Sequence, residues 1–290
     1  MTRVGFAGLG RMGALMAANV ARTGFPLGVW NRTVARAEDV AGATGAVVHA
    51  TPRELAEQSD VVITMLADDR SSDEVHLGAD GLFAAGGGAG HVIEMGTLSP
   101  RHVRRLADDA GNRVIVDAPV SGSVDAARDA DLMIMVGATE STIEPLRPVL
   151  DAMSREIICL GSLGRGATMK LAVNMLIHGL NQTLAESLTL AEAAGIPLDI
   201  AYQAIEESAA AAPVVRYRKQ LYLDEHAHPV SFALSLARKD VELAVELADE
   251  FGVPMPQTQL NLDQLRAAEE AGYGDRDMAS IINYLRGSTC

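Results

Sequence analysis

Up to about Gly161, the chain alternates short apolar runs with segments of helical periodicity. The runs, rich in β-branched and other apolar residues, occupy 3–7, 27–30, 46–48, 60–65, 91–95, 113–117, 132–136 and 157–160. Strand-sized runs separated by helical segments are typical of βαβ units, in which helices cover both faces of a parallel sheet. We therefore predict an α/β first domain over residues 1–163.

Two helix starts between these strands have a clear local signature. Thr51, Pro52 and Glu54 have the spacing of a capping box with proline at the first helical position. Ser99 followed by Pro100 repeats the pairing of a hydroxyl residue with proline. We expect helices to begin at both prolines.

After Gly166 the apolar residues recur at helical spacing instead. Residues 167–194 contain no proline and one glycine, Gly179, which permits a single helix of ~28 residues, about 42 Å long. Gly195 and Pro197 would end it. Shorter helices are expected over 198–208, 214–221, 240–251, 256–271 and 278–285, with one short strand at 232–236. The sequence thus predicts an all-helical second domain, residues 164–290, entered through a long inter-domain helix.

The net charge and the hydropathy of the chain limit which classes of binding partner we expect. The 24 basic and 38 acidic residues give a net charge of −14, and so negative a chain repels nucleic acid and anionic membrane surfaces at long range. No apolar run approaches the ~18 residues of a membrane span. Residues 4–21 resemble a signal peptide in composition, but Arg11 and regularly spaced glycines favour a folded segment. We expect neither nucleic acid nor membrane as a partner.

The two cysteines, Cys159 and Cys290, are too few for a disulfide framework or a zinc site. We expect a reducing, cytoplasmic setting and no bound metal.

A glycine motif follows the first predicted strand. It reads GLGRMG over residues 8–13 and opens a helix. In this context Gly8 permits a tight turn, Gly10 lets a pyrophosphate approach the backbone, and Gly13 lets the helix pack on the strand. We predict dinucleotide binding at this loop, including Arg11 and Met12; the alternative is a glycine-rich turn without a ligand.

The end of the second strand indicates which dinucleotide. An NAD site usually has an acidic residue there, but this chain has Asn31, Arg32 and Thr33, with Arg36 one turn further. A guanidinium, a hydroxyl and a second cation suit a 2′-phosphate. We predict NADP(H) as cofactor. The alternative is that Thr33 only caps the next helix and Arg32 is a solvated charge.

Four motifs, in order along the chain, resemble those of the β-hydroxyacid dehydrogenase family. They are GFAGLGRMGALMAANVARTG at 5–24, DAPVSGS at 117–123, GRGATMKLAVN at 164–174 and RKDVELA at 238–244. The family includes 3-hydroxyisobutyrate dehydrogenases, tartronate semialdehyde reductases and glyoxylate/succinic semialdehyde reductases. The resemblance implies a Rossmann domain, a helical domain and a homodimer or homotetramer.

The resemblance makes Lys170 the catalytic residue. Asn174 lies four residues later, so both side chains leave one face of the long helix and can meet one substrate. Hydride delivery to a carbonyl leaves charge on oxygen, which an ammonium can stabilise and protonate. His178 lies a further turn along, but the family motif stops at Asn174, and we do not expect His178 to be catalytic.

The other assignments also follow the resemblance. Ser121, Gly122 and Ser123 would hold the substrate carboxylate as a small anion nest. Without the resemblance, the same residues are equally compatible with a turn that ends a strand and binds no ligand. Lys239 would reach the cofactor, and Thr97 would lie near the nicotinamide. Leu66 and Ala67 would pass beside the dinucleotide at the carboxyl edge of the sheet.

Two positions depart from the family pattern. The family usually has glycine where Ser123 stands, and again where Ala130 precedes a predicted strand. These changes bear on substrate identity more than on the chemistry.

The sequence therefore favours NADPH-dependent reduction of a small aldehyde or ketone that carries a carboxylate, or the reverse oxidation of a 3-hydroxy acid. An imine reductase is the nearest rival, but Asp or Tyr commonly replaces the lysine there. An enzyme of the 6-phosphogluconate type needs a much longer helical region. A non-catalytic NADP-binding interaction protein is the alternative outside enzymology.

Overall fold

The computed structural model describes residues 1–287, so Cys290 lies outside the described residues. The chain divides into two compact units. Unit 1 is Met1–Lys170, and unit 2 begins at Leu171. Each unit is described by itself below.

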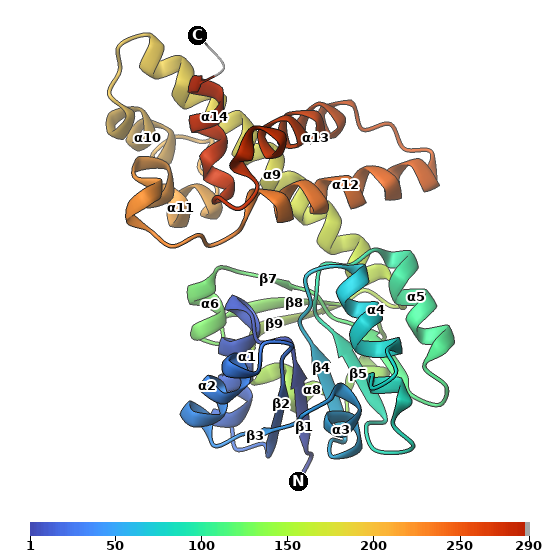
Figure 1. The fold of residues 1–290 in the computed structure, drawn as a ribbon. Coiled ribbons are helices and arrows are strands. Elements are labelled where there is room, and N and C mark those ends of the chain that lie inside the picture. The colour runs from blue at the N-terminus through green and yellow to red at the C-terminus, as the bar shows by residue number, and fades with distance from the viewer. Residues whose placement is uncertain (288–290) are drawn as a thin grey trace. The chain divides into compact units, whose positions relative to one another are not determined.

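Unit 1 is built on a six-stranded sheet with the strand order β3-β2-β1-β4-β5-β6 (Figure 1). Its strands are β1 (Val4–Ala7), β2 (Leu27–Trp30), β3 (Val47–Val48), β4 (Val61–Thr64), β5 (His91–Glu94) and β6 (Val114–Asp117). Every neighbouring pair is parallel. This is the doubly wound order of a Rossmann fold, in which ligands bind where the order reverses, between β1 and β4. The predicted fold class is confirmed.

Side chains of these strands alternate between two apolar cores. Phe6 and Ile63 face the core that contains Met16. Ala7 and Val62 face the opposite core, which contains Leu55. Both faces of the central strands are therefore buried, which explains why they read as continuous apolar runs.

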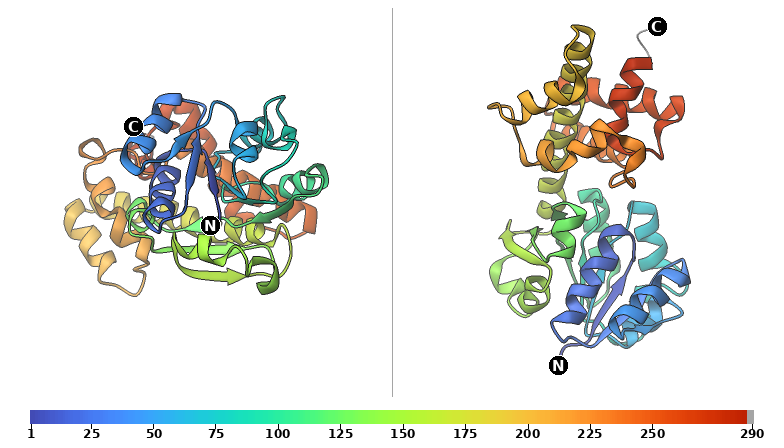
Figure 2. Two further views of the ribbon diagram at one scale, coloured as in Figure 1. Left: turned by 90° about the horizontal axis from the view of Figure 1, so that it is seen from below. Right: turned by 90° about the vertical axis from the view of Figure 1, so that its left-hand side faces the viewer.

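Helices connect the strands and lie on both sides of the sheet (Figures 1 and 2). They are α1 (Arg11–Arg22), α2 (Val34–Thr44), α3 (Pro52–Glu57), α4 (Asp69–Leu77), the short η1 (Leu82–Ala84) and α5 (Pro100–Asp109). Both predicted helix starts are confirmed. The side chain of Thr51 accepts a hydrogen bond from the amide of Glu54, and that of Ser99 from the amide of His102. The carboxylate of Glu54 accepts from Ala50 rather than Thr51, so the second half of the capping box is shifted by one residue.

The last strands of unit 1 form a separate sheet in the order β7-β8-β9. They are β7 (Val120–Ser121), β8 (Leu132–Val136) and β9 (Ser154–Cys159), accompanied by α6 (Val124–Arg128), α7 (Glu140–Ile143) and α8 (Arg147–Asp151). β7 and β8 are antiparallel, whereas β8 and β9 are parallel. The predicted strands at 132–136 and 157–160 therefore form, but outside the doubly wound sheet. β7 was not predicted, because two residues carry no periodicity.

Ala130 stands in the left-handed region with φ of 57°, immediately before Asp131 and β8. This conformation costs a residue with a Cβ about 1–2 kcal/mol, whereas glycine adopts it freely. The backbone thus explains the glycine that the family pattern has at this position.

Unit 2 is helical. The long helix is confirmed as α9 (Arg165–Ala193), which spans 29 residues, and its residues from Leu171 onward belong to unit 2. The other elements are α10 (Leu198–Glu206), α11 (Pro213–Leu223), η2 (Glu225–Ala227), α12 (Leu234–Phe251), α13 (Pro256–Ala268), η3 (Glu269–Tyr273), η4 (Met278–Ser280) and α14 (Ile281–Gly287). Leu184 and Leu188 of α9 share one core with Tyr202, Val241 and Leu265. Figure 2 shows the later helices packed along the C-terminal part of α9.

The predicted strand at 232–236 is wrong. Leu234 begins α12, and Leu234, Ala237 and Val241 are buried on one face of it. Only Ala233 pairs as a strand would, in an isolated bridge to Asp277. Spacings of three and four residues, which continue past 236, outweigh the short apolar run.

No helix within the described residues is both long and apolar enough to cross a membrane.

Candidate functional site

The glycine loop after β1 has the geometry expected of a dinucleotide loop. Gly8 has φ of +96°, and a Cβ there would lie 2.4 Å from the carbonyl oxygen of Met65. A Cβ on Gly13 would lie 2.0 Å from the carbonyl oxygen of Gly8. A Cβ on Gly10 would meet nothing within 4 Å. Two glycines are therefore needed by the fold itself, and the third leaves open space where a ligand can approach the backbone.

The N-terminus of α1 suits an anion. Gly10 is its N-cap residue and supplies no side-chain cap, and the first turn contains no acidic residue. Asn31 holds this turn, because its Oδ1 accepts from the Leu9 amide at 2.9 Å while its Nδ2 donates to the Thr33 carbonyl at 2.9 Å. The amides of a first turn lack helical partners and carry partial positive charge. The residues present thus fit a pyrophosphate at this position.

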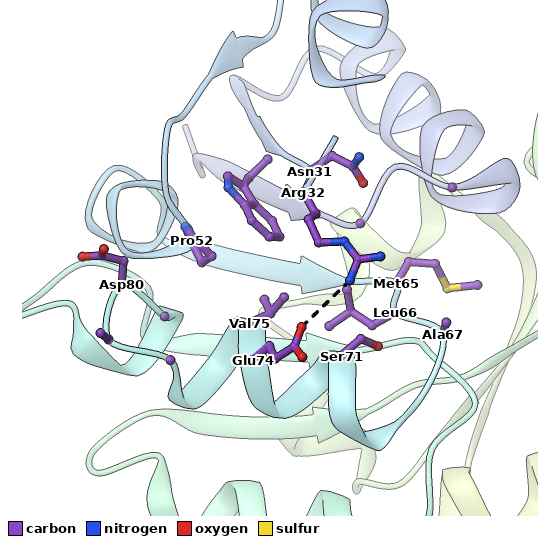
Figure 3. Close-up of a pocket in the computed structure, with 16 residues that line it drawn as sticks. Asn31, Arg32, Pro52, Met65, Leu66, Ala67, Ser71, Glu74, Val75 and Asp80 are labelled. Carbon is purple, nitrogen blue, oxygen red and sulfur yellow. Dashed lines mark ion pairs between the residues drawn. The ribbon is translucent and has the colours of Figure 1, made fainter. Parts of the chain in front are cut away.

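A pocket of about 540 Å³ opens beside this loop (Figure 3). Five segments line it: the loops that follow β1, β2 and β4, the start of α3 at Pro52, and the region from α4 to Gly81. The lining residues are Gly8, Gly10, Trp30, Asn31, Arg32, Pro52, Met65, Leu66, Ala67, Ser71, Glu74, Val75, Gly78, Ala79, Asp80 and Gly81. Six predicted cofactor residues are brought together here: Gly8, Gly10, Asn31, Arg32, Leu66 and Ala67. The predicted residues Arg11, Met12, Gly13, Thr33, Arg36, Thr97 and Lys239 do not line this pocket.

Arg32 extends into the pocket mouth. Its side chain is 80% exposed, and its Nη1 lies 3.9 Å from Oε2 of Glu74 on α4. Thr33 is the N-cap residue of α2, but its side chain makes no cap hydrogen bond. Arg36 is exposed in the first turn of α2. Capping therefore does not occupy the Thr33 hydroxyl, and the two arginines are accessible to an anion.

Replacing Gly10 by alanine is expected to weaken dinucleotide binding about tenfold or more while leaving the unfolding temperature nearly unchanged, because the new methyl group occupies only ligand space. The backbone of Gly10 has φ of −73° and ψ of −164°, which alanine adopts without strain. Gly13→Ala is the matched control and should instead destabilise the protein by about 1–3 kcal/mol through overpacking. Thermal unfolding and a fluorescence titration with NADPH separate the two. Unchanged binding in Gly10→Ala would show that the cofactor does not approach this loop.

A buried polar pair lies beneath the turn that follows β5. The carboxylate of Glu94 accepts from Oγ of Ser72 at 3.1 Å and lies 3.6 Å from Nε2 of His76. Burial raises the pKa of Glu94 to about 7 and lowers the pKa of His76 to about 4. Gly96, which precedes Thr97, lies close to this carboxylate, because a Cβ on Gly96 would be 3.4 Å from Oε1 of Glu94. The pair thus lies next to the backbone that carries Thr97.

Asp117 fixes the start of α9. It is buried at the end of β6, where Oδ1 accepts from the Gly164 amide at 2.9 Å and Oδ2 from the Ala167 amide at 2.8 Å. Burial raises the pKa of Asp117, and these amide hydrogen bonds partly offset the rise. A Cβ on Gly137 would lie 2.0 Å from Oδ1. The carboxylate therefore anchors the first turn of α9, one turn before Lys170, the last residue of unit 1 and half-buried.

Within unit 2, Asp240 gathers three polar side chains. Its Oδ2 accepts from Nδ2 of Asn174 at 2.5 Å and lies 3.7 Å from Nε2 of His178, while Nζ of Lys239 lies 3.0 Å from its Oδ1. Asp240 is 1% exposed. The ring of His178 also packs against that of Phe232, with the centroids 5.7 Å apart. The carboxylate therefore orients the amide of Asn174 and offsets the charge of Lys239.

The DAPVSGS segment provides a turn of defined geometry. Ser121 ends β7, and Gly122 has φ of 154°, with a Cβ there 2.7 Å from the side chain of Leu132. Oγ of Ser123 accepts from the Ala126 amide and so caps α6. Ser123 therefore has a structural role here that glycine could not fill.

Several residues of these clusters were missed from the sequence, among them Asp117, Asp240 and Glu74. Asp117 and Asp240 lie within the motifs DAPVSGS and RKDVELA, but only their position in the motif could have singled them out. Glu74 does not lie in a recognisable motif. The sequence could have indicated it only through its position on α4, because α4 follows β4 and the carboxyl end of β4 lies where the strand order reverses.

Comparison with known proteins agrees with this geometry. Residues 3–161 match the NAD-binding domain of 6-phosphogluconate dehydrogenase, and residues 164–285 match the NAD-binding domain of NADP-dependent 3-hydroxyisobutyrate dehydrogenase. Glyoxylate/succinic semialdehyde reductase 1 of Arabidopsis thaliana is 30% identical, with 98% of this chain and 99% of that protein covered. The chain belongs to the β-hydroxyacid dehydrogenase family.

Two further members support the family assignment. The 2-hydroxy-3-oxopropionate reductase of Escherichia coli is 30% identical, with 98% of this chain and 97% of that protein covered. The structure of 3-hydroxyisobutyrate dehydrogenase from Mycobacterium tuberculosis matches with a TM-score of 0.84, 30% identity and 99% of both chains covered. As a β-hydroxyacid dehydrogenase, this chain is a nicotinamide-dependent oxidoreductase that acts on CH–OH groups. The resemblance seen in the sequence is confirmed.

Proposed function

We propose that this protein interconverts a small carboxylate-bearing aldehyde or ketone and the corresponding 3-hydroxy acid, with NADP(H) as cofactor and Lys170 as general acid and base. The observation that carries the proposal is the placement of Lys170 and Asn174 one turn apart on α9. Asp117 holds the first turn of that helix, and Asp240 holds the amide of Asn174. Relatives named as semialdehyde reductases support the same substrate class.

The preference for NADP(H) is supported by the end of β2. Arg32 lines the pocket, and the strand-end positions Asn31 and Thr33 carry no carboxylate. A 2′-phosphate would gain charge-assisted hydrogen bonds from the guanidinium, whereas the free 2′-hydroxyl of NAD(H) would find no acidic acceptor at the strand end. Arg36, one turn along α2, adds a second cation.

For the reaction itself, the bound nicotinamide would supply the hydride. The ammonium of Lys170 would donate a hydrogen bond to the carbonyl oxygen of the substrate, stabilise the charge that develops there and give up its proton. Asn174 would orient the same substrate with its amide. Ser121 and the backbone amides of Gly122 and Ser123 would hold the carboxylate.

The test is NADPH oxidation followed at 340 nm with a panel of small aldehydes. Tartronate semialdehyde, whose reduction gives a 3-hydroxy acid, represents the proposed class. Glyoxylate and succinic semialdehyde, whose reduction gives a 2-hydroxy and a 4-hydroxy acid, vary the distance between carbonyl and carboxylate, and glycolaldehyde and propanal are the controls without a carboxylate. We expect turnover that requires the carboxylate. Turnover of cyclic imines alone would favour an imine reductase, and NADPH binding without any turnover would favour an interaction protein.

We further propose a homodimer in a cytoplasmic setting. Unit 2 exposes several large apolar side chains, with relative exposures of 69% for Leu176, 68% for Phe251 and 68% for Leu260. Exposed apolar surface on paired helices is typical of a symmetric interface.

Sedimentation at micromolar concentration should therefore give a species at least twice the chain mass of 30.5 kDa. The double variant Phe251→Asp/Leu260→Asp should shift toward monomer, because two carboxylates would be desolvated at the interface. Val47→Asp, at a residue 61% exposed in unit 1, is the control and should leave the assembly intact. A wild-type protein that sediments only as monomer would contradict the proposal.

A further inference from the structure

Arg32 and Glu74 face one another across the mouth of the cofactor pocket. Arg32 follows β2 and Glu74 lies on α4, and Figure 3 shows both side chains reaching toward each other from separate elements. Nη1 and Oε2 are 3.9 Å apart, and the side chains are 80% and 55% exposed. An acidic group thus stands beside the guanidinium that would hold a 2′-phosphate.

The pair contributes little to the fold. Exposed ion pairs of this kind stabilise proteins weakly, because solvent screens them and ordering the side chains costs entropy. α4 is held instead by its capping box, in which the side chain of Asp68 accepts from the Ser71 amide, and by its buried residues Ser72, Val75 and His76. Glu74 belongs neither to the capping box nor to the buried residues of α4, so we expect its charge to affect ligand binding rather than stability.

A 2′-phosphate that binds Arg32 would interact unfavourably with the carboxylate of Glu74. The phosphate would replace Glu74 as the partner of the guanidinium, and the two anions would then lie within a few ångströms of each other. A cofactor that lacks the 2′-phosphate neither displaces Glu74 from Arg32 nor places a second anion beside it. The carboxylate therefore affects only the contribution of the 2′-phosphate to binding.

We propose that Glu74 is a cofactor-specificity residue, which competes with the 2′-phosphate for Arg32 and so limits the preference for NADP(H) over NAD(H). This inference rests on the proposed use of NADP(H). In this proposal Arg32 makes the pocket prefer NADP(H) to NAD(H), and Glu74 reduces the size of that preference.

The neighbouring acid Asp80 supplies the control. It lines the same pocket, but it lies 3.2 Å from Nη2 of Arg53 rather than beside Arg32. Asp80→Asn removes the same charge from the same pocket wall. Any effect common to Asp80→Asn and Glu74→Gln therefore reflects net charge, and only the difference between them reflects the position of Glu74.

The experiment is calorimetric titration of the cofactor-free protein with 2′,5′-ADP and 5′-AMP, which differ in the 2′-phosphate alone, and then with NADPH and NADH. At an ionic strength of about 50 mM, where screening is weak, Glu74→Gln should bind 2′,5′-ADP and NADPH about three- to tenfold more tightly. Binding of 5′-AMP and NADH should change less than about twofold, as should all four ligands in Asp80→Asn. In an Arg32→Ala background the gain should fall below about twofold, because the contested guanidinium is absent.

The inference is overturned if Glu74→Gln leaves 2′,5′-ADP binding unchanged or weakens it, or if Asp80→Asn gives an equal gain. Failure of the proposed cofactor preference looks different. In that case the wild-type protein would bind 5′-AMP as tightly as 2′,5′-ADP, and Arg32→Ala would change neither.

Discussion

Alanine in place of Lys170 is expected to lower kcat by about 10²- to 10⁴-fold, the usual contribution of a positioned acid or base. The ammonium is assigned to the reacting carbonyl and lies outside the phosphate-binding loop. NADPH binding should therefore stay near the wild-type value. Steady-state kinetics on the best aldehyde of the panel, with NADPH binding followed by fluorescence, measures the two effects separately.

Two companion variants sharpen this result. Lys170→Arg should restore little activity, because a guanidinium keeps the charge but cannot release its proton near neutral pH. Asn174→Ala should raise KM as well as lower kcat, because it removes an orienting group rather than the proton donor. Near-wild-type turnover in Lys170→Ala would refute the proposed chemistry.

Removal of the Arg32 side chain should weaken NADPH binding by roughly 10- to 150-fold, since a charge-assisted hydrogen bond contributes about 1.5–3 kcal/mol. NADH binding should change little, because the guanidinium is assigned to the 2′-phosphate alone. Arg53→Ala is the matched control, since Arg53 is a nearby arginine paired with Asp80. Fluorescence titration with both cofactors provides the measurement, and an unchanged dissociation constant for NADPH in Arg32→Ala would remove the basis for the NADP(H) assignment.

The doubly wound sheet could be predicted because its strands are buried on both faces. Phe6 and Ala7 are adjacent and enter opposite cores, and both are fully buried. Such strands are apolar at most positions, and glycine or capping residues mark where they end. α9 was predictable for a different reason. Few helix-breaking residues interrupt it, and Gly195, which has φ of +87°, follows its end.

The second sheet and the start of α12 depended on contacts that the local sequence does not encode. Val120 and Ser121 form β7 only because Ile134 and Met133 are present to pair with them. An apolar stretch near residue 234 is compatible with either strand or helix until its packing partners are known.

The site was predictable where a motif has a local cause and not where it depends on distant pairing. Gly8 has a positive φ in its own turn, and a Cβ on Gly13 would meet the carbonyl oxygen of Gly8 in that same turn. Asp117 meets the Gly164 amide 47 residues away, and Asp240 meets Asn174 across 66 residues. Periodicity does not reveal such partners, so the carboxylates that hold the first turn of α9 and the amide of Asn174 became evident only in the folded chain.

Deuterium transfer from the cofactor tests most directly whether this chain reduces a carboxylate-bearing carbonyl compound with Lys170 as proton donor. The wild-type protein would be incubated with each C4-deuterated epimer of NADPH and the best aldehyde of the panel, and the product acid would be analysed by mass spectrometry. One epimer should deliver a single deuterium to the carbinol carbon, and Lys170→Ala should form this product at a rate at least about 10²-fold lower. A product acid without deuterium from either epimer, or equal rates of labelling in the two proteins, would contradict it.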